Sequence, residues 1–338
     1  MAEMMKAALW VAPEQIEVRE IPRPVAGEGQ ALIRVTHGGI CGTDMMIYLG
    51  KHPRARAPLV MCHEFVGTLV EDAGPFSAGA PVAVNPLLTC GECYPCRNGL
   101  AHICDRLGLV GIDSDGGFAE YALAPLHTVR PLPESLPLVQ AALIEPLAVA
   151  VHALRVSDLR VGNVTAILGA GPIGIMTAQV ARLAGARKVL VSERSPARLE
   201  IARKMGFQVI DAAHQDVVQI ALEETGGAGL PVVFETAGVQ ATIAQAGEMA
   251  RPGGQILQVG IPKAPVTVDM ASLLYREVRR SPIRVYREKD FDAAIEIAAG
   301  GTLDLTTPVT HTLPLDELAE AMEIAHHAAD ACKILLTP

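Results

Sequence analysis

The sequence has little charge for its length. Asp, Glu, Lys and Arg make up 19% of its 338 residues, apolar residues make up 50%, and the mean hydropathy is +0.30. A disordered chain carries more charge and fewer apolar residues than this, so extensive disorder is excluded. The chain is also long enough to bury two sizeable cores.

An excess of basic residues is absent as well. Lys and Arg number 28 and Asp and Glu number 37, which gives a net charge of −9. An acidic surface repels nucleic-acid phosphates and anionic lipids, so we expect neither as a partner. The longest uncharged stretch, residues 161–181, approaches the length of a membrane span of about 20 residues. It contains glycines and a proline, so a buried strand, turn and helix explain it better.

We also expect no secretion signal. The first residues, MAEMMKAALW, show no basic segment followed by an apolar core, so we expect a cytoplasmic protein. In that reducing compartment the seven cysteines are expected to be thiols or metal ligands and not disulfides.

The apolar pattern changes near residue 148. Before it, short alternating segments separated by Pro, Gly and Asp predict an irregular β-rich domain. After it, the strand-like runs VTAIL, KVLVS, PVVFE and QILQVG alternate with segments of helical spacing, which predicts a parallel sheet covered on both faces. One such segment carries the apolar stripe Ile173, Met176, Val180 and Leu183. Beyond residue 286, two helical segments and the run KILLT are expected to return to the first domain. We therefore predict one domain at residues 1–147 with 286–338 and another at residues 148–285.

A glycine-rich turn follows the run VTAIL. Gly169, Gly171 and Gly174 form the pattern G-x-G-x-x-G, and Pro172 suits the first position of a helix. We predict that this turn, from Gly169 through Pro172 and Ile173 to Gly174, binds a dinucleotide pyrophosphate. A turn that only packs a helix onto a sheet is the alternative.

Glu193 ends the next predicted strand, 19 residues after Gly174. A carboxylate there can accept hydrogen bonds from both ribose hydroxyls and would repel a 2′-phosphate, so NAD is favoured over NADP. Arg194 and Arg198 keep NADP open, because an arginine beside the ribose accommodates the 2′-phosphate.

A cluster of four cysteines lies in the first domain. Cys90, Cys93, Cys96 and Cys104 have the spacing C-x2-C-x2-C-x7-C, which suits a tetrahedral zinc site with no open position and therefore a structural role. Two disulfides are the alternative, disfavoured by the expected compartment and the tight spacing. His102 could replace Cys104 as a ligand. A nucleic-acid zinc finger is disfavoured by the acidic charge balance.

A second candidate metal site combines Cys41 in GGICGTDMMIY with His63 and Glu64 in VMCHEFVG. A thiolate, an imidazole and a carboxylate can hold zinc and leave a fourth position for water or substrate. Taken singly, the cysteine and the histidine also suit ordinary core positions. Glu145, within the apolar run LIEPLAVAVHA, is costly to bury unless it meets a cation.

The order of these motifs, with GGFAEY and GAGPIG between and after them, resembles the zinc-dependent medium-chain dehydrogenases over nearly the whole chain. The resemblance is greatest to the branch of sorbitol, threonine and butanediol dehydrogenases. It implies an α/β fold in which a Rossmann doubly wound parallel sheet joins a β-rich GroES-like catalytic domain.

The same resemblance implies roles for single residues. Cys41, His63 and Glu64 match the ligands of a catalytic zinc, Glu145 matches a carboxylate that reaches this metal directly or through water, and Thr43 matches a hydroxyl that takes the substrate proton. The four-cysteine cluster matches a structural zinc site. Two further stretches resemble segments that pass beside the nicotinamide: ETAG at residues 235–238, and VGI with Val259 and Ile261. Arg198 is a cofactor-binding candidate on its charge alone, as described above.

Two positions depart from the family pattern. Met46 stands where polyol and alcohol enzymes usually carry a histidine that conducts the substrate proton, and Cys62 replaces a common glycine. The expected route of the proton from Thr43 is therefore a cofactor ribose hydroxyl and water.

The function that the resemblance implies is hydride transfer between NAD and a secondary alcohol, such as a polyol, sugar alcohol, diol or hydroxy amino acid. Two zinc ions per subunit, a small-molecule alcohol or ketone as the reaction partner, and a homotetramer or homodimer are expected. One alternative is an NADPH-dependent carbonyl reductase of the same fold. Another is a redox regulator that binds NAD and zinc without turnover.

Overall fold

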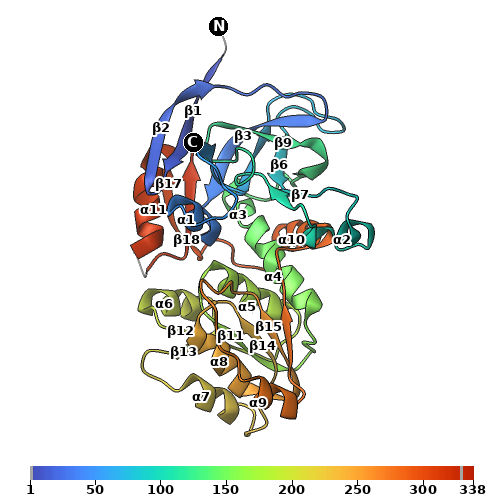
Figure 1. Ribbon diagram of the computed structural model, residues 1–338, viewed down its shortest axis with the longest axis vertical. Coiled ribbons are helices and arrows are strands. Elements are labelled where there is room, and N and C mark those ends of the chain that lie inside the picture. Colours follow the sequence, from blue (N-terminus) through green and yellow to red (C-terminus); the bar gives the residue numbers. More distant parts are fainter. Residues whose placement is uncertain (1–2, 328–329) are drawn as a thin grey trace. The chain divides into compact units, whose positions relative to one another are not determined.

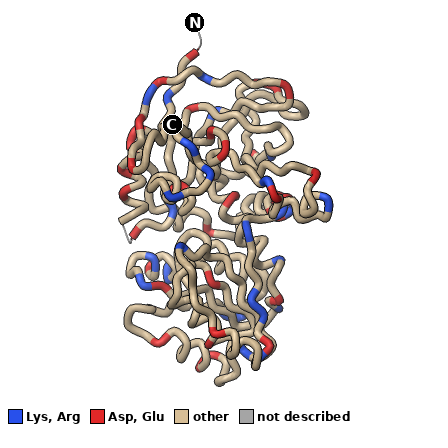
Figure 2. The backbone as a smooth tube through the Cα atoms, in the orientation of Figure 1, with Lys and Arg blue, Asp and Glu red and all other residues tan. Residues whose placement is uncertain are grey.

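The computed structural model describes residues 3–327 and 330–338 and divides the chain into two units. One unit contains the residues up to Glu145 together with those from Arg287 onward, and the other contains Pro146–Tyr286 (Figure 1). Basic and acidic residues occur along the backbone of both units (Figure 2). None of the helices in the described part of the chain is both long and apolar enough to cross a membrane.

Six parallel strands form the sheet of the unit Pro146–Tyr286. Their bounds are β11 Val164–Leu168, β12 Lys188–Glu193, β13 Gln208–Asp211, β14 Leu230–Glu235, β15 Ala250–Gln258 and β16 Arg279–Pro282. Their order is β13-β12-β11-β14-β15-β16, and every neighbouring pair is parallel. The chain thus starts in the middle of the sheet and winds outward twice, which is the doubly wound arrangement.

Helices connect these strands and cover the sheet. Their bounds are α4 Ile144–Val156, which begins in the other unit, α5 Pro172–Leu183, α6 Pro196–Lys204, α7 Val217–Glu223, α8 Gln240–Met249 and α9 Met270–Tyr275. Helix α5 packs against β11 and β12, and α8 packs against β14 and β15. Every residue of β11 is buried, as expected for a central strand covered on both faces.

The other unit is built from strands. Their bounds are β1 Met4–Ala12, β2 Gln15–Pro22, β3 Gln30–Gly39, β4 Leu59–Val60, β5 Glu64–Leu69, β6 Pro81–Val84, β7 Leu87–Leu88, β8 Gly108–Leu109, β9 Tyr121–Pro125, β10 Val129–Pro131, β17 Val309–Pro314 and β18 Lys333–Thr337. A seven-stranded sheet has the order β10-β6-β5-β3-β18-β17, and β9 also pairs with β3. Two smaller sheets have the orders β2-β1-β4 and β7-β8.

Short helices complete this unit. They are α1 Gly42–Tyr48, α2 Tyr94–Arg97, α3 Leu138–Ala141, α10 Glu288–Ala299 and α11 Leu318–His327, with 3-10 turns at Ala101–Ile103, Leu126–Thr128 and Leu315–Glu317. Strand β18 pairs with β3, so a strand near the end of the chain joins a sheet whose other strands, apart from β17, lie before residue 132 (Figure 1).

The predicted fold class is confirmed. The runs VTAIL, KVLVS, PVVFE and QILQVG fall in β11, β12, β14 and β15, and helices separate them. Two strands of the same sheet, β13 and β16, were not predicted. Of the predicted apolar stripe, Met176 and Val180 are buried, whereas Leu183 is 48% exposed because α5 ends there.

Candidate functional site

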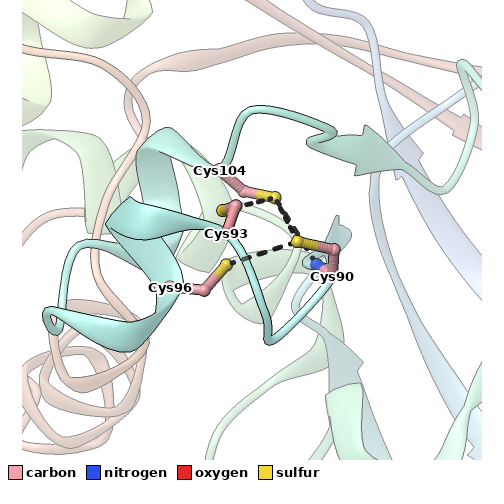
Figure 3. A group of neighbouring side chains, drawn as sticks. All are labelled: Cys90, Cys93, Cys96 and Cys104. Carbon is pink, nitrogen blue, oxygen red and sulfur yellow. Dashed lines mark hydrogen bonds between the residues drawn. The ribbon is translucent and has the colours of Figure 1, made fainter.

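The four predicted cysteines gather in one lobe of the strand-rich unit. Their ligand atoms all lie within 4.8 Å of one another, and they converge from the segments around the short helix α2 (Figure 3). The sulfur of Cys104 lies 3.4 Å from that of Cys90 and 3.7 Å from that of Cys93, and the sulfur of Cys90 lies 3.9 Å from that of Cys96. All four are free thiols, and His102 is not part of this close group.

These separations fit a tetrahedral metal ion. Four thiolates at about 2.3 Å from zinc lie about 3.8 Å apart, whereas a disulfide would bring two sulfurs to about 2 Å. The guanidinium of Arg106 lowers the pKa of Cys90 to about 6, while burial and the neighbouring thiols raise the pKa of Cys96 to about 12. Cys90 and Cys96 thus differ in how readily they lose a proton, and a bound cation would favour the thiolate form of both.

The second predicted metal site is assembled by strand pairing. Gly39, at the end of β3, pairs with Glu64, at the start of β5, which brings the following Cys41 beside His63 and Glu64. The ligand atoms of these three residues lie within 4.8 Å of one another. His63 and Glu64 are buried, with 4% and 2% of their surface exposed, while Cys41 is partly exposed.

Charged groups around this site favour a cation. Burial opposes protonation of His63, but the Asp44 carboxylate and the Cys41 thiol raise its pKa well above the ordinary value. Asp44 Oδ1 lies 3.7 Å from His63 Nδ1. Among the described side chains neither atom has a hydrogen-bond partner. A sulfur, a nitrogen and an oxygen donor in negative surroundings are a ligand set that zinc accepts, and three ligands leave a position open.

Lys333 is a charged residue at this site that the sequence analysis missed. Its side chain is 1% exposed, its ammonium donates to Ile40 O at 2.9 Å, and it pairs with Glu64 Oε2. Burial opposes its charge, but Glu64, Cys41 and Glu145 raise its pKa. A Cβ at Gly39 would lie 2.7 Å from both Glu64 Oε2 and Lys333 Cε, so glycine there makes room for the pair.

The remaining predicted residues of this site differ in placement. Thr43 Oγ1 lies 3.9 Å from Cys41 Sγ, on the first turn of α1. Glu145 is buried and acts electrostatically on His63 and Lys333. Among the described residues, however, the group of ligand atoms within 4.8 Å contains Cys41, His63 and Glu64 and does not include Glu145.

The glycine turn lies at the carboxyl end of β11, before α5. Gly169 has a φ of 108°, a backbone angle that residues with a Cβ rarely adopt. A Cβ at Gly174 would lie 1.9 Å from Gly169 O, so only glycine fits there. Nothing lies within 4 Å of a Cβ at Gly171, so space remains in front of the helix N-terminus. Pro172 is the first residue of α5 and Gly171 precedes it as N-cap. This is the geometry that presents free backbone N–H groups to a phosphate.

A cavity of about 520 Å³ extends from this turn within the unit Pro146–Tyr286. Its lining residues are Gly169, Gly171, Ser192, Glu193, Arg194, Arg198, Ala212, Thr236, Ala237, Val239, Ala241, Thr242 and Gln245. Glu193 Oε2 accepts a hydrogen bond from Ala170 N at 2.9 Å, and its Oε1 accepts from Arg194 N and Ser195 N at 2.7 and 3.0 Å. The carboxylate is thus fixed beside the glycine turn.

The other predicted cofactor residues do not line this cavity. Pro172, Ile173 and Gly174 belong to the first turn of α5. Val259 donates its backbone N–H to Glu235 O at 2.8 Å, and Ile261 is 76% exposed. Their contact with a cofactor stays a prediction.

Comparisons with known proteins identify relatives for both units. The family described as zinc-binding dehydrogenase matches residues 172–300, and the family described as alcohol dehydrogenase GroES-like domain matches residues 27–134. The 2-dehydro-3-deoxy-L-galactonate 5-dehydrogenase of Pseudoalteromonas atlantica is 36% identical over 321 residues, which are 94% of each chain.

Solved structures are similar over almost the full length. The 2R,3R-butanediol dehydrogenase of Bacillus subtilis superposes with a TM-score of 0.92 at 30% identity, covering 99% of each chain. A zinc-binding dehydrogenase structure from Sinorhizobium meliloti 1021, determined with bound NADP, has a TM-score of 0.94 at 33% identity and covers 99% of this chain and 100% of its own.

Proposed function

Since the chain belongs to the zinc-dependent medium-chain dehydrogenases, we propose that it transfers hydride between NAD and a secondary alcohol at a zinc ion held by Cys41, His63 and Glu64. The observation that supports this most directly is the close approach of these three ligand atoms. Zinc supplies a Lewis acid for the substrate oxygen, and the nicotinamide supplies the hydride acceptor.

The residues of the chain prepare this chemistry. The carboxylate of Asp44 lies 3.7 Å from the imidazole of His63, and Lys333 offsets the negative charge of the ligand set. Thr43 Oγ1 takes up the proton of the substrate hydroxyl. Met46 has no group that conducts a proton, so a bound cofactor would have to supply a ribose hydroxyl, with water, to receive the proton from Thr43. Glu145, which acts electrostatically on His63 and Lys333, is a further carboxylate that would be able to bind the metal directly or through water.

A second zinc ion in the four-cysteine lobe is part of the proposal. The sulfur separations of 3.4–3.9 Å support it, and four protein ligands leave no position for substrate. Its role is to hold the segment of residues 90–104. A lobe of four thiols keeps its metal only where thiols stay reduced, which supports the cytoplasm as the compartment.

The substrate is a polyol, sugar alcohol, diol or hydroxy amino acid with a secondary hydroxyl. Two of the dehydrogenases similar to this chain, one for a sugar acid and one for a diol, support this class. NAD is the proposed cofactor because the Glu193 carboxylate lines the cavity where a 2′-phosphate would lie.

An NADPH-dependent carbonyl reductase is a second candidate. Arg194 and Arg198 line the same cavity as Glu193, and a similar structure holds NADP. Arginine beside the ribose accommodates the 2′-phosphate. Initial rates with NAD and NADP at equal concentration, followed by the absorbance of the reduced nicotinamide, decide between the two.

The proposed assembly is a homotetramer or homodimer. Strand β16 is the edge of the parallel sheet, and the neighbouring helix α9 exposes Leu274 and Tyr275, which are 71% and 84% exposed. Exposed apolar side chains next to a sheet edge support self-association there. Light scattering of the purified chain measures the assembly.

The test of the proposed function compares two cysteine variants. Cys41→Ser should lower kcat/KM for secondary alcohols by at least about 100-fold while the fold persists, because it removes a ligand of the reactive metal. Cys93→Ser should instead lower the thermal midpoint by about 6–12 °C, as a loss of about 3 kcal/mol would in a unit of this size. Elemental analysis should find two zinc ions in the unmodified chain and fewer in each variant.

Three outcomes would contradict the proposal. Full activity of the Cys41→Ser chain would exclude the reactive zinc, and equal loss of stability in both variants would contradict the division of roles. Binding of NADH and zinc without turnover of any polyol, diol or hydroxy amino acid would favour the redox regulator.

A further inference from the structure

Gln245 carries an unsatisfied hydrogen-bond acceptor at the cofactor cavity. The residue lies on the second turn of α8, is half-buried and lines the cavity that begins at the glycine turn. Its Oε1 is buried and has no hydrogen-bond partner among the residues that the structure describes. Burying an amide oxygen without a partner is unfavourable, so this position is expected to gain a donor from a bound molecule.

The other polar groups of the α8 wall are already paired. Thr242 Oγ1 donates to Glu235 Oε1 at 2.7 Å and lies 3.0 Å from Val239 O. Ala241 offers only a methyl group and no polar atom on its side chain. The amide of Gln245 is therefore the group on this wall that can recognise a polar edge of a ligand.

Two other parts of the lining are assigned by the proposed function, on which this inference rests. The glycine turn suits the pyrophosphate, and Glu193 suits the ribose attached to it. Gln245 shares the cavity with Glu193, so the base that it meets is the one carried by that ribose, which is adenine in both NAD and NADP.

We propose that the side-chain amide of Gln245 hydrogen-bonds the edge of this adenine and makes the chain selective for adenine dinucleotides. Adenine presents an N6 amino donor beside the N7 acceptor, and a glutamine amide matches both, as it does when proteins read adenine in DNA. Hypoxanthine replaces the amino group with an oxygen, so its edge presents two acceptors. A glutamine amide cannot satisfy two adjacent acceptors with its single carbonyl and amino pair.

The test compares NADH with reduced nicotinamide hypoxanthine dinucleotide, which differ only at this group of the base. Titration of the intact zinc-loaded protein by calorimetry gives both dissociation constants without turnover. The expected ratio is about 5- to 150-fold in favour of NADH, the range for one bidentate base contact. In Gln245→Met, which keeps the volume and removes the amide, the ratio should fall to about one, mainly through weaker NADH binding.

Gln240 provides the matched control. It lies on the same helix outside the cavity lining, and its amide is already paired with Thr267 through bonds of 2.9 and 2.8 Å. Gln240→Met should therefore keep the preference for NADH. A circular dichroism spectrum establishes that each variant is folded.

The outcomes separate this inference from the proposed function. Equal binding of the two dinucleotides by the unmodified chain would overturn the inference and leave the dehydrogenase proposal standing. A preference that survives in Gln245→Met would assign recognition to another residue and also overturn it. Failure to bind either dinucleotide would overturn the cofactor proposal itself.

Discussion

At the scale of single residues, Cys62 occupies a backbone conformation that suits glycine. Its φ is 86°, in the left-handed region, and it directly precedes His63. Its thiol donates to Glu64 O at 3.5 Å. The sequence identified this position as one where related proteins carry glycine, and the structure gives the physical reason. A side chain is tolerated here at the cost of backbone strain.

Two variants isolate that strain. Cys62→Gly and Cys62→Ala both remove the thiol and its packing, but only alanine keeps a Cβ at the positive φ. We expect the glycine variant to be about 1 kcal/mol more stable than the alanine variant, measured by urea unfolding. An alanine variant as stable as the glycine variant would show that the backbone is relaxed at this position.

The buried pair of Lys333 and Glu64 could not be found in the sequence, because 269 residues separate its members. Only the pairing of β18 with β3 brings them together. The sequence does show a lysine at the start of the apolar run KILLT. The run predicts a strand, but it does not indicate which carboxylate pairs with the lysine.

Lys333→Met should destabilise the zinc-free chain by about 3–5 kcal/mol, because it leaves the Glu64 carboxylate buried without its partner. Zinc relieves this state, so the affinity of the Cys41 site for zinc should rise about tenfold. Urea unfolding and competition with a zinc chelator measure the two effects.

The control is Lys6→Met, which breaks an exposed ion pair with Asp316 at 2.7 Å and should cost less than about 1 kcal/mol of unfolding free energy. Weaker zinc binding by Lys333→Met would contradict the assigned role.

At the scale of elements, sequence patterns predicted the strands that are rich in apolar residues and missed those that are not. Strands β11 and β12 have runs of buried residues, whereas β13 reads QVID and β16 reads RRSP. The two missed strands lie at the edges of the sheet. An edge strand has a neighbouring strand on one side only, so fewer of its side chains have to be apolar. Hydrogen bonding to an adjacent strand, not the pattern of its own residues, defines an edge strand of this kind.

The contact between α1 and α11 is another long-range feature of this kind. Tyr48 is buried, and its hydroxyl donates to Glu323 Oε1 at 2.8 Å. Burial and then this hydrogen bond to the carboxylate raise the pKa of Tyr48 to about 12. Because α1 begins next to Cys41, this bond links the last helix of the chain to the helix of the metal site.

The raised pKa makes this contact sensitive to alkaline pH. A group whose pKa is higher in the folded state stabilises the fold fully below its unfolded pKa, about 10 for tyrosine, and loses that effect as the pH rises through the folded value. The difference in unfolding free energy between the unmodified chain and Tyr48→Phe should therefore be constant below pH 10 and narrow between about pH 10 and 12. Urea unfolding across this range measures it. In chains that also carry Glu323→Gln, the difference in unfolding free energy between Tyr48 and its Phe variant should finish decreasing at a lower pH. A difference that stays constant to pH 12 in the unmodified background would contradict the role of this bond.

At the scale of the whole molecule, the order of motifs predicted the kind of chemistry but not the geometry. Cys41 and His63 were recognised as candidate ligands, yet only the pairing of β3 with β5 shows that their ligand atoms meet. Both candidate metal sites lie in the strand-rich unit, and the cavity at the glycine turn lies in the unit Pro146–Tyr286. Metal and dinucleotide are thus expected to stabilise different parts of one chain.

This separation leads to a prediction for the intact protein. NADH at about 100 times its dissociation constant should stabilise the unit that binds it by about 2.7 kcal/mol, and removal of zinc should destabilise the other unit. Hydrogen exchange followed by mass spectrometry can locate both effects. With NADH, slower exchange is expected in the peptides of β11, β12 and α8. With a chelator, faster exchange is expected in residues 41–64 and 90–104.

Two-domain chains often unfold in separate steps, so NADH binding and zinc removal should change different transitions in calorimetry. Faster exchange of β11 and β12 on zinc removal, equal to that of the cysteine lobe, would show instead that the chain unfolds as one unit.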